Sequence, residues 1–119
     1  MSAMHAPAPT LLLLPDAYEY LCEADLPVGG MRRVPVGEFG VCVAHLEDGY
    51  YAIEDACNHS GASLARGLLK AHVVTCYLHR FDFDVRDGRL LTKPRLCEDQ
   101  FRFPLARVGD KLYIDRGGR

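Results

Sequence analysis

Apolar residues occur along most of the chain in short runs separated by turn-forming residues, a pattern that suits β-strands. Residues 41–46 (VCVAHL) and 50–53 (YYAI) are two such runs, separated by residues 47–49 (EDG). Further turn signals stand at residues 87–88 (DG) and 109–110 (GD), each between two apolar or β-branched runs. Such pairs are typical of β-hairpins, because glycine readily adopts the positive φ that tight turns require. The pattern predicts a series of antiparallel hairpins.

Helical periodicity is not sustained anywhere in the sequence, although residues 62–69 have room for a turn or two of helix. Glycine and proline interrupt residues 28–41 too often for a long helix. Residues 73–75 (VVT) add another β-branched run. We therefore predict an all-β fold, an antiparallel β-sandwich or barrel.

The first fifteen residues (MSAMHAPAPTLLLLP) differ from the rest, since they contain three Pro, three Ala and no charged side chain. We expect residues 1–15 to form a flexible arm and residues 16–119 to form a single domain. The Leu run at residues 11–14 is far shorter than the roughly 20 residues that span a membrane. No Lys or Arg precedes it, so it does not resemble an export signal either.

Composition narrows the class of protein. Fourteen basic and sixteen acidic residues give a formal net charge of −2, which offers no general argument for nucleic-acid binding. With 49% hydrophobic and 25% charged residues, the chain reads as an ordinary globular protein. Five Cys is an odd number without disulfide-framework spacing, so we expect the reducing cytoplasm, where thiols stay free for metals.

Candidate metal ligands fall in two short segments. Cys57-x-His59 is followed after sixteen residues by Cys76-x-x-His79, and each segment comes directly after a predicted strand. Two loops at one end of a β-scaffold can present two thiolates and two imidazoles to one centre, a donor set that suits iron, copper or zinc. Structural zinc modules usually pair Cys with Cys and His with His, so the interleaved order here fits zinc less well.

The segments CNHSGASL and CYLHRFDFDVRDG resemble the cluster-binding motifs of Rieske iron–sulfur proteins, and the resemblance extends over residues 18–115. It implies one [2Fe–2S] cluster per chain, with Cys57 and Cys76 on the inner iron and His59 and His79 on the outer iron. It also implies a Rieske-like antiparallel β-sandwich or barrel in which two loops form a cluster-binding subdomain.

The same resemblance bears on the reduction potential. Ala62 and Leu78 stand where respiratory Rieske proteins carry a further Cys in each loop, and Phe81 and Phe83 stand where those proteins place hydroxyls. Because fewer hydrogen bonds stabilise the reduced state less, we predict a low potential of about −150 mV within the family range of about −150 to +300 mV. Arg80 replaces a residue that is often Gly, and its charge would favour the reduced state.

In function, the resemblance implies a monomeric one-electron carrier that takes electrons from a flavin-containing reductase and delivers them to a terminal oxygenase. The chain has no room for a catalytic domain with a mononuclear iron site, so we expect no substrate turnover of its own. A small subunit of a larger, nitrite-reductase-like complex is one alternative, and a zinc-bound interaction module is another. A basic rim near the cluster would favour an acidic partner surface; its expected members are Arg66, Lys70, Lys93 and Arg95.

The remaining Cys and His residues are expected to belong to the framework. His45 and His72 fall in predicted strands, and His5 falls in the arm. Asp84 is expected to hold the second loop through hydrogen bonds to the backbone. The other thiols are predicted to be small buried apolar groups: Cys22, Cys42 and Cys97.

Overall fold

Short antiparallel strands make up almost all of the regular structure in the computed structural model, which describes residues 14–92 and 96–119. In chain order the elements are β1 (Tyr18–Glu23), β2 (Met31–Val36), β3 (Phe39–Leu46), β4 (Gly49–Glu54), the 3-10 helix η3 (Leu64–Arg66), β5 (Leu68–Lys70), β6 (Val73–Thr75), β7 (Asp82–Asp84), β8 (Arg102–Phe103), β9 (Leu105–Val108) and β10 (Lys111–Asp115). The predicted all-β fold is confirmed. Of the predicted arm, residues 1–13 lie outside the described residues, so the division into arm and domain stays a prediction.

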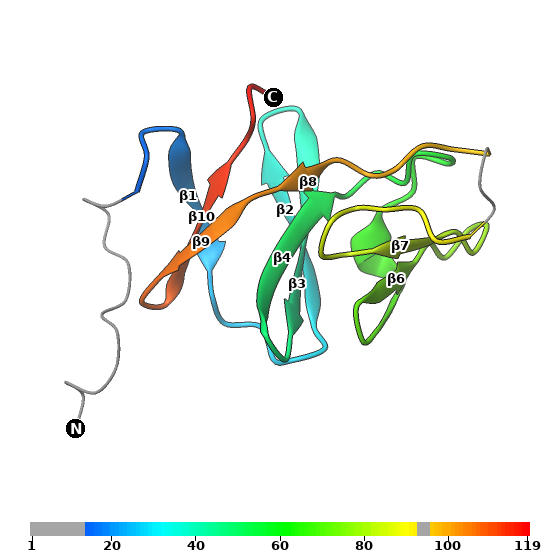
Figure 1. Cartoon of the computed structure of the whole chain (residues 1–119), viewed down its shortest axis with the longest axis horizontal. Helices are drawn as coiled ribbons and strands as arrows, with labels where there is room; N and C mark the ends of the chain where they lie inside the picture. The colour runs from blue at the N-terminus through cyan, green and yellow to red at the C-terminus, as the bar shows by residue number, and fades with distance from the viewer. Residues whose placement is uncertain (1–13, 93–95) are drawn as a thin grey trace.

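The strands form three sheets, with orders β1-β10-β9, β2-β3-β4-β8 and β5-β6-β7. The four-stranded sheet lies between the other two groups, with β1, β9 and β10 on one side and β6 and β7 on the other (Figure 1). The part of the chain that carries the two candidate loops therefore has a small sheet of its own. In the described ranges, no helix is long and apolar enough to cross a bilayer.

Strand β3 contributes to two separate cores, because successive side chains of a strand point to opposite faces of the sheet. Val41 and Val43 face what we call the base core, whose buried members are Leu21, Val41, Val43, Ala52, Phe103, Leu112 and Ile114. Cys42, Ala44 and Leu46 face the loop core, whose buried members also include Ile53, Cys57, Ala62, Leu64, Val74, Cys76, Phe81, Phe83 and Val85. The run VCVAHL is apolar on both faces for this reason.

Two of the predicted hairpins form as expected. Val108 pairs with Lys111 across a two-residue turn, and Gly109 in that turn has a φ of 62°. Leu46 pairs with Gly49, so the central residues of that turn are 47 and 48. Gly49 supplies the positive φ, 146°, as the first residue of β4 rather than inside the turn.

The predicted hairpin at residues 87–88 is reduced to an isolated bridge between Phe83 and Leu90. Two backbone hydrogen bonds of 2.8 Å still join residues 89 and 91 to residues 84 and 82 of β7. A segment from later in the chain binds residues 88 and 90 in addition. Gln100 N–H donates to the Gly88 carbonyl at 2.7 Å, and Leu90 N–H donates to the Asp99 carboxylate at 2.8 Å. A Cβ at Gly88 would collide with the Gln100 carbonyl oxygen, so this crossing requires glycine.

The turn or two of helix expected within residues 62–69 is present as the single turn of η3, after which the chain continues directly into β5. Two local expectations need correction. His72 lies in the turn between β5 and β6 rather than in a strand. Cys42 is fully buried as predicted, whereas Cys22 and Cys97 are only partly buried.

Candidate metal centre

The first candidate loop follows β4 and is closed by backbone hydrogen bonds on both sides of Cys57. Cys57 N–H donates to the Ala62 carbonyl at 2.7 Å, and Gly61 N–H donates to the Cys57 carbonyl at 2.7 Å. Gly61 has a φ of 77°, which turns the chain back toward η3. The thiol of Cys57 is buried in the loop core while His59 is exposed.

The second loop follows β6 and repeats the same hydrogen-bond plan. Cys76 N–H donates to the Phe81 carbonyl at 2.9 Å, and Arg80 N–H donates to the Cys76 carbonyl at 3.0 Å. Arg80 has a φ of 58° and thus occupies the position that Gly61 occupies in the first loop. A side chain there costs about 1–2 kcal/mol relative to glycine. This cost explains why the position is often Gly. Arg80 nevertheless adopts the positive φ that a glycine would have there.

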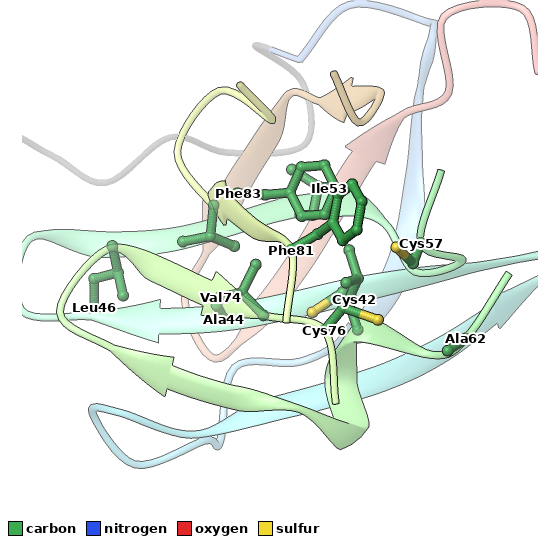
Figure 2. Packing of buried hydrophobic residues seen from close by; sticks show 12 residues of the cluster. Cys42, Ala44, Leu46, Ile53, Cys57, Ala62, Val74, Cys76, Phe81 and Phe83 are labelled. Carbon is green, nitrogen blue, oxygen red and sulfur yellow. The ribbon is translucent and has the colours of Figure 1, made fainter. Parts of the chain in front are cut away.

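The four predicted ligands come together as two pairs at one end of the loop core. The thiols of Cys57 and Cys76 lie within hydrogen-bond reach of each other, and Figure 2 shows both at the end of the core opposite Leu46. The Nδ1 atoms of His59 and His79 lie 3.1 Å apart, and both rings are exposed. Among the residues that the structure describes, no three His, Cys, Asp or Glu side chains are placed to hold a single metal ion.

This donor set fits a [2Fe–2S] centre, in which each iron takes two protein ligands. Burial raises the pKa of the Cys76 thiol, but hydrogen bonds outweigh burial and the pKa lies below its ordinary value. The donors are the Ser60 hydroxyl, the backbone N–H groups of Leu78 and His79, and the Cys57 thiol. Since the thiolate is the form that binds metal, these groups prepare Cys76 for ligation.

Ser60 is a tuning candidate that the sequence analysis missed. Its Oγ lies 3.6 Å from the Cys76 sulfur and accepts a hydrogen bond from Ala62 N–H at 3.3 Å, which leaves the hydroxyl proton available to the sulfur. Phe81 and Phe83 offer no hydroxyl, as predicted. Phe81 instead stacks on the His59 ring with the two centroids 4.4 Å apart.

Gln100 is a second residue that the sequence analysis missed. It is 5% exposed and bridges three backbone groups of the segment that leads into the first loop. Its amide oxygen accepts a hydrogen bond from Asn58 N–H at 2.6 Å. Its amide nitrogen donates to the carbonyls of Glu54 and Ala56 at 2.8 and 2.9 Å. No local pattern could have shown this, because the partners lie more than forty residues away in sequence.

Asp55 anchors the same segment from the other side. This buried carboxylate accepts a hydrogen bond from Ala65 N–H at 2.8 Å and forms an ion pair with the Arg33 Nε atom at 3.2 Å. The Asp55 carbonyl also accepts from Leu64 N–H. Strand β2, helix η3 and the start of the first loop are thereby fastened together.

Asp84 accepts a backbone hydrogen bond as expected, but from Arg86 in the turn after β7 rather than from the second loop. Its carboxylate accepts from Arg86 N–H at 3.0 Å, and the Arg86 guanidinium adds two further bonds at 3.0 and 2.8 Å. The hydrogen bonds from Arg86 hold the pKa of the Asp84 carboxyl below its ordinary value, although burial opposes them. Sequence spacing did not indicate the guanidinium as the main partner.

Two of the four expected members of the basic rim, Arg66 and Lys70, belong to the described structure. Arg66 and Arg80 line a common cavity beside Cys76. Lys70 ends β5 next to the turn at residues 71–72. Lys93 and Arg95 lie outside the described residues.

An antiparallel β-fold that brings two buried thiols and two exposed imidazoles together on matched loops defines a Rieske-type iron–sulfur protein. A model of the Rieske [2Fe–2S] domain family matches residues 16–104, and the chain belongs to that family. Its cofactor is accordingly a Rieske-type [2Fe–2S] cluster.

Known relatives are small carriers of the same kind. The ferredoxin subunit of 3-phenylpropionate/cinnamic acid dioxygenase from Photorhabdus laumondii is 32% identical over 98 residues, covering 80% of this chain and 90% of the relative. A solved complex of reduced oxygenase and oxidized ferredoxin in carbazole 1,9a-dioxygenase contains a chain that is 30% identical to this one, with a TM-score of 0.76. The match covers 85% of this chain and 94% of that chain. The carbazole 1,9a-dioxygenase ferredoxin of Nocardioides aromaticivorans is 26% identical, with a TM-score of 0.74, and the match covers 82% of this chain and 95% of that chain.

Proposed function

We propose that this chain is a ferredoxin that passes single electrons from a flavin-containing reductase to a terminal oxygenase. Cys57 and Cys76 would hold the inner iron of its cluster, and His59 and His79 would hold the outer iron. The observation that carries the proposal is the pair of matched loops, which bury the two thiols and expose the two imidazoles. When bound, the cluster accepts and gives up one electron at a time.

The protein residues provide a route between the buried thiols and solvent. The Cys side chains lie inside the loop core, where water is excluded. The exposed rings of His59 and His79 lie at the surface, so we infer that electrons enter and leave on this side. Stacking on Phe81 orients the His59 ring. Such a carrier turns over no substrate of its own.

Two observations support an oxygenase as the acceptor. The relatives are named as ferredoxin components of dioxygenases, and the chain covers about nine tenths of their length. One matched chain was solved in a complex of oxygenase and ferredoxin. We favour this acceptor over a nitrite-reductase-like complex, and we propose that the carrier itself is a cytoplasmic monomer.

The ligand assignment is tested by spectroscopy of the purified protein. We expect a red-brown protein with iron and acid-labile sulfide, and a dithionite-reduced EPR spectrum with the low average g that His ligation produces. His59→Cys and His79→Cys should each change that spectrum, whereas His72→Cys, in the turn between β5 and β6, should leave it unchanged. A colourless protein that contains only zinc, or unchanged spectra in both ligand variants, would contradict the assignment.

The potential is tested by redox titration. Phe81 and Phe83 provide no hydroxyl. The Ser60 hydroxyl is a donor to the Cys76 sulfur, and the sequence analysis did not foresee this donor. We expect a potential near the lower end of the range, about −150 mV. A value clearly above zero would contradict this expectation.

A further inference from the structure

A small cavity of about 200 Å³ opens beside the second loop, and we call it the notch. Arg66 and Arg80 both line it, together with the exposed Leu68 and the ring of Tyr77. Cys76, a predicted ligand, forms part of its wall. The notch therefore lies directly next to the centre from which electrons leave.

Two positive charges that lack an ion-pair partner among the described residues line this one small cavity. Within the described ranges, neither the Arg66 nor the Arg80 guanidinium forms an ion pair with a carboxylate. Six other cations do have such partners, namely Arg32, Arg33, Arg86, Lys111, Arg116 and Arg119. The remaining described cations, Lys70, Arg89, Arg102 and Arg107, form no ion pair either, but none of them lines the notch. The notch thus concentrates positive charge on a chain whose formal net charge is −2.

Both arginines are positioned by the fold. Arg66 ends η3, and its guanidinium carbon lies 5.4 Å from the centroid of the Tyr77 ring. Arg80 has a φ of 58°, a conformation that glycine adopts without strain and arginine does not. The two arginines that line the cavity therefore start from anchored backbone positions, which reduces the entropy lost when they bind a common anion.

The rim of the notch is apolar. Leu68 is 71% exposed and Tyr77 is 46% exposed, and both line the notch. Exposed apolar groups around a charged recess suit a protein partner, because they gain from burial while the charges select the partner.

We propose that the notch receives a carboxylate side chain, Asp or Glu, from an acidic surface of the redox partner, between Arg66 and Arg80. This inference rests on the proposed electron-transfer function. It adds the charge class of the partner surface and the two residues that recognise it.

The test uses the reduced, cluster-containing protein and two small oxidants of opposite charge, ferricyanide and hexaammineruthenium(III). Stopped-flow rates are compared for the unmodified protein, Arg66→Gln, Arg80→Gln and the double variant. Gln at position 80 keeps a side chain at the same positive φ, so the comparison isolates the charge. Arg107→Gln is the control, because Arg107 lies in β9, on the far side of the central sheet from β6 and β7 (Figure 1).

We expect the double variant to react roughly tenfold more slowly with ferricyanide at low ionic strength, because steering by local charge is lost. The difference should disappear near 1 M salt, where the screening length falls to about 3 Å. The cationic oxidant should not be slowed, which excludes a general effect on potential, and Arg107→Gln should change neither rate. Equal ferricyanide rates in all variants would overturn the proposal.

Competition separates an acidic peptide from a free anion. A hexaglutamate peptide should slow ferricyanide oxidation of the unmodified protein but not of the double variant, and a hexalysine peptide should slow neither. Inhibition by inorganic phosphate equal to that by hexaglutamate, at matched ionic strength, would overturn the assignment to an acidic protein surface. Failure of the proposed function would look different, since a protein without a reducible cluster would react with neither oxidant.

Discussion

At the scale of the residue, the centre is built from two loops that obey one backbone plan. In each loop the Cys N–H and carbonyl are both used in closing hydrogen bonds, so the thiol direction follows from the backbone. The fourth residue after each Cys has a positive φ, and it is Gly61 in one loop and Arg80 in the other. Side-chain identity then decides what surrounds the sulfurs, and Ser60 is the one hydroxyl recorded at the Cys76 sulfur in the described structure.

Replacement of this hydroxyl should lower the reduction potential. The hydrogen bond from Ser60 to the Cys76 sulfur stabilises the reduced state, because that state carries more negative charge, and Ser60→Ala removes it. We expect a decrease of roughly 60 mV, since a hydrogen bond to a charged group contributes about 1.5 kcal/mol and 59 mV corresponds to tenfold for one electron. Redox titration measures this change.

Ser63→Ala is the matched control, because the buried Ser63 hydroxyl has no hydrogen-bond partner in the described structure. Its removal should leave the potential unchanged. Equal potentials in Ser60→Ala and the unmodified protein would show that the Ser60 hydroxyl does not act on the sulfur.

At the scale of the element, the two loops depend on segments that are remote in sequence. Gln100 lies just before β8 and holds residues 54–58, which connect β4 to the first loop. Asp55 links the same connection to η3 and β2. Asp84 and Arg86 close the turn after β7, the strand that follows the second loop. Buried polar side chains of this kind fix loop position because each lost partner leaves an unsatisfied group.

Loss of Gln100 should therefore weaken the first loop. Gln100→Leu keeps a similar volume but leaves Asn58 N–H and the carbonyls of Glu54 and Ala56 without their partner. We expect a loss of about 3 kcal/mol in unfolding free energy, together with lower iron content. Urea unfolding and iron analysis measure the two effects.

Asn58→Ala provides the comparison for that variant. It removes only the exposed side-chain bond to the Asp99 carbonyl and keeps the backbone N–H that Gln100 binds. Asn58→Ala should lower the unfolding free energy by no more than about 0.5 kcal/mol. A cost for Gln100→Leu as small as that for Asn58→Ala would refute the anchoring role.

The Asp84–Arg86 pair should make stability depend on pH in acid. Because the pKa of Asp84 is lowered in the folded state, its contribution is present above the unfolded value of about 3.9 and is lost as pH falls through the folded value. Arg86→Gln should therefore destabilise the protein at pH 7. The difference from the unmodified protein should shrink as pH falls below about 4.

Thermal unfolding at several pH values measures this dependence. Arg89→Gln removes the same charge from an exposed position without a carboxylate ion pair in the described ranges, and it should show no comparable dependence. A difference between Arg86→Gln and the unmodified protein that stays constant down to pH 2 would rule out the pair as its origin.

At the scale of the whole molecule, the central sheet separates two cores. The base core joins it to β1, β9 and β10, and the loop core joins it to β6 and β7. Cys57 and Cys76 belong to the loop core (Figure 2), whereas none of the proposed ligands belongs to the base core. Metal binding is thus coupled to one core more directly than to the other.

Removal of the metal should loosen the two cores unequally. After iron chelation we expect amides of β6 and β7 to exchange with solvent much faster, while amides of β9 and β10 keep their protection. Hydrogen exchange followed by mass spectrometry measures this. Cys57→Ala should reproduce the pattern without chelator, and equal loss of protection in all four strands would contradict the separation of the cores.

Local features of the fold were predictable from sequence because they depend on neighbouring residues. The hairpin at residues 109–110 followed from a glycine between two strand-forming runs. The hairpin at residues 87–88 forms only an isolated bridge with a few hydrogen bonds between its arms, and its contact with Gln100, a residue distant in sequence, carried no local signal. His72 was wrongly assigned to a strand because the end of β5 and its turn carry no distinct signal.

The sequence by itself determined the class of the centre, because the spacing of Cys57, His59, Cys76 and His79 places each ligand pair on one short loop. Only the tertiary structure decided what surrounds that centre. The hydroxyl of Ser60 reaches a sulfur sixteen residues away, and Gln100 binds a loop more than forty residues away. Contacts of this kind depend on how the sheets pack, and no local pattern of residues encodes that packing.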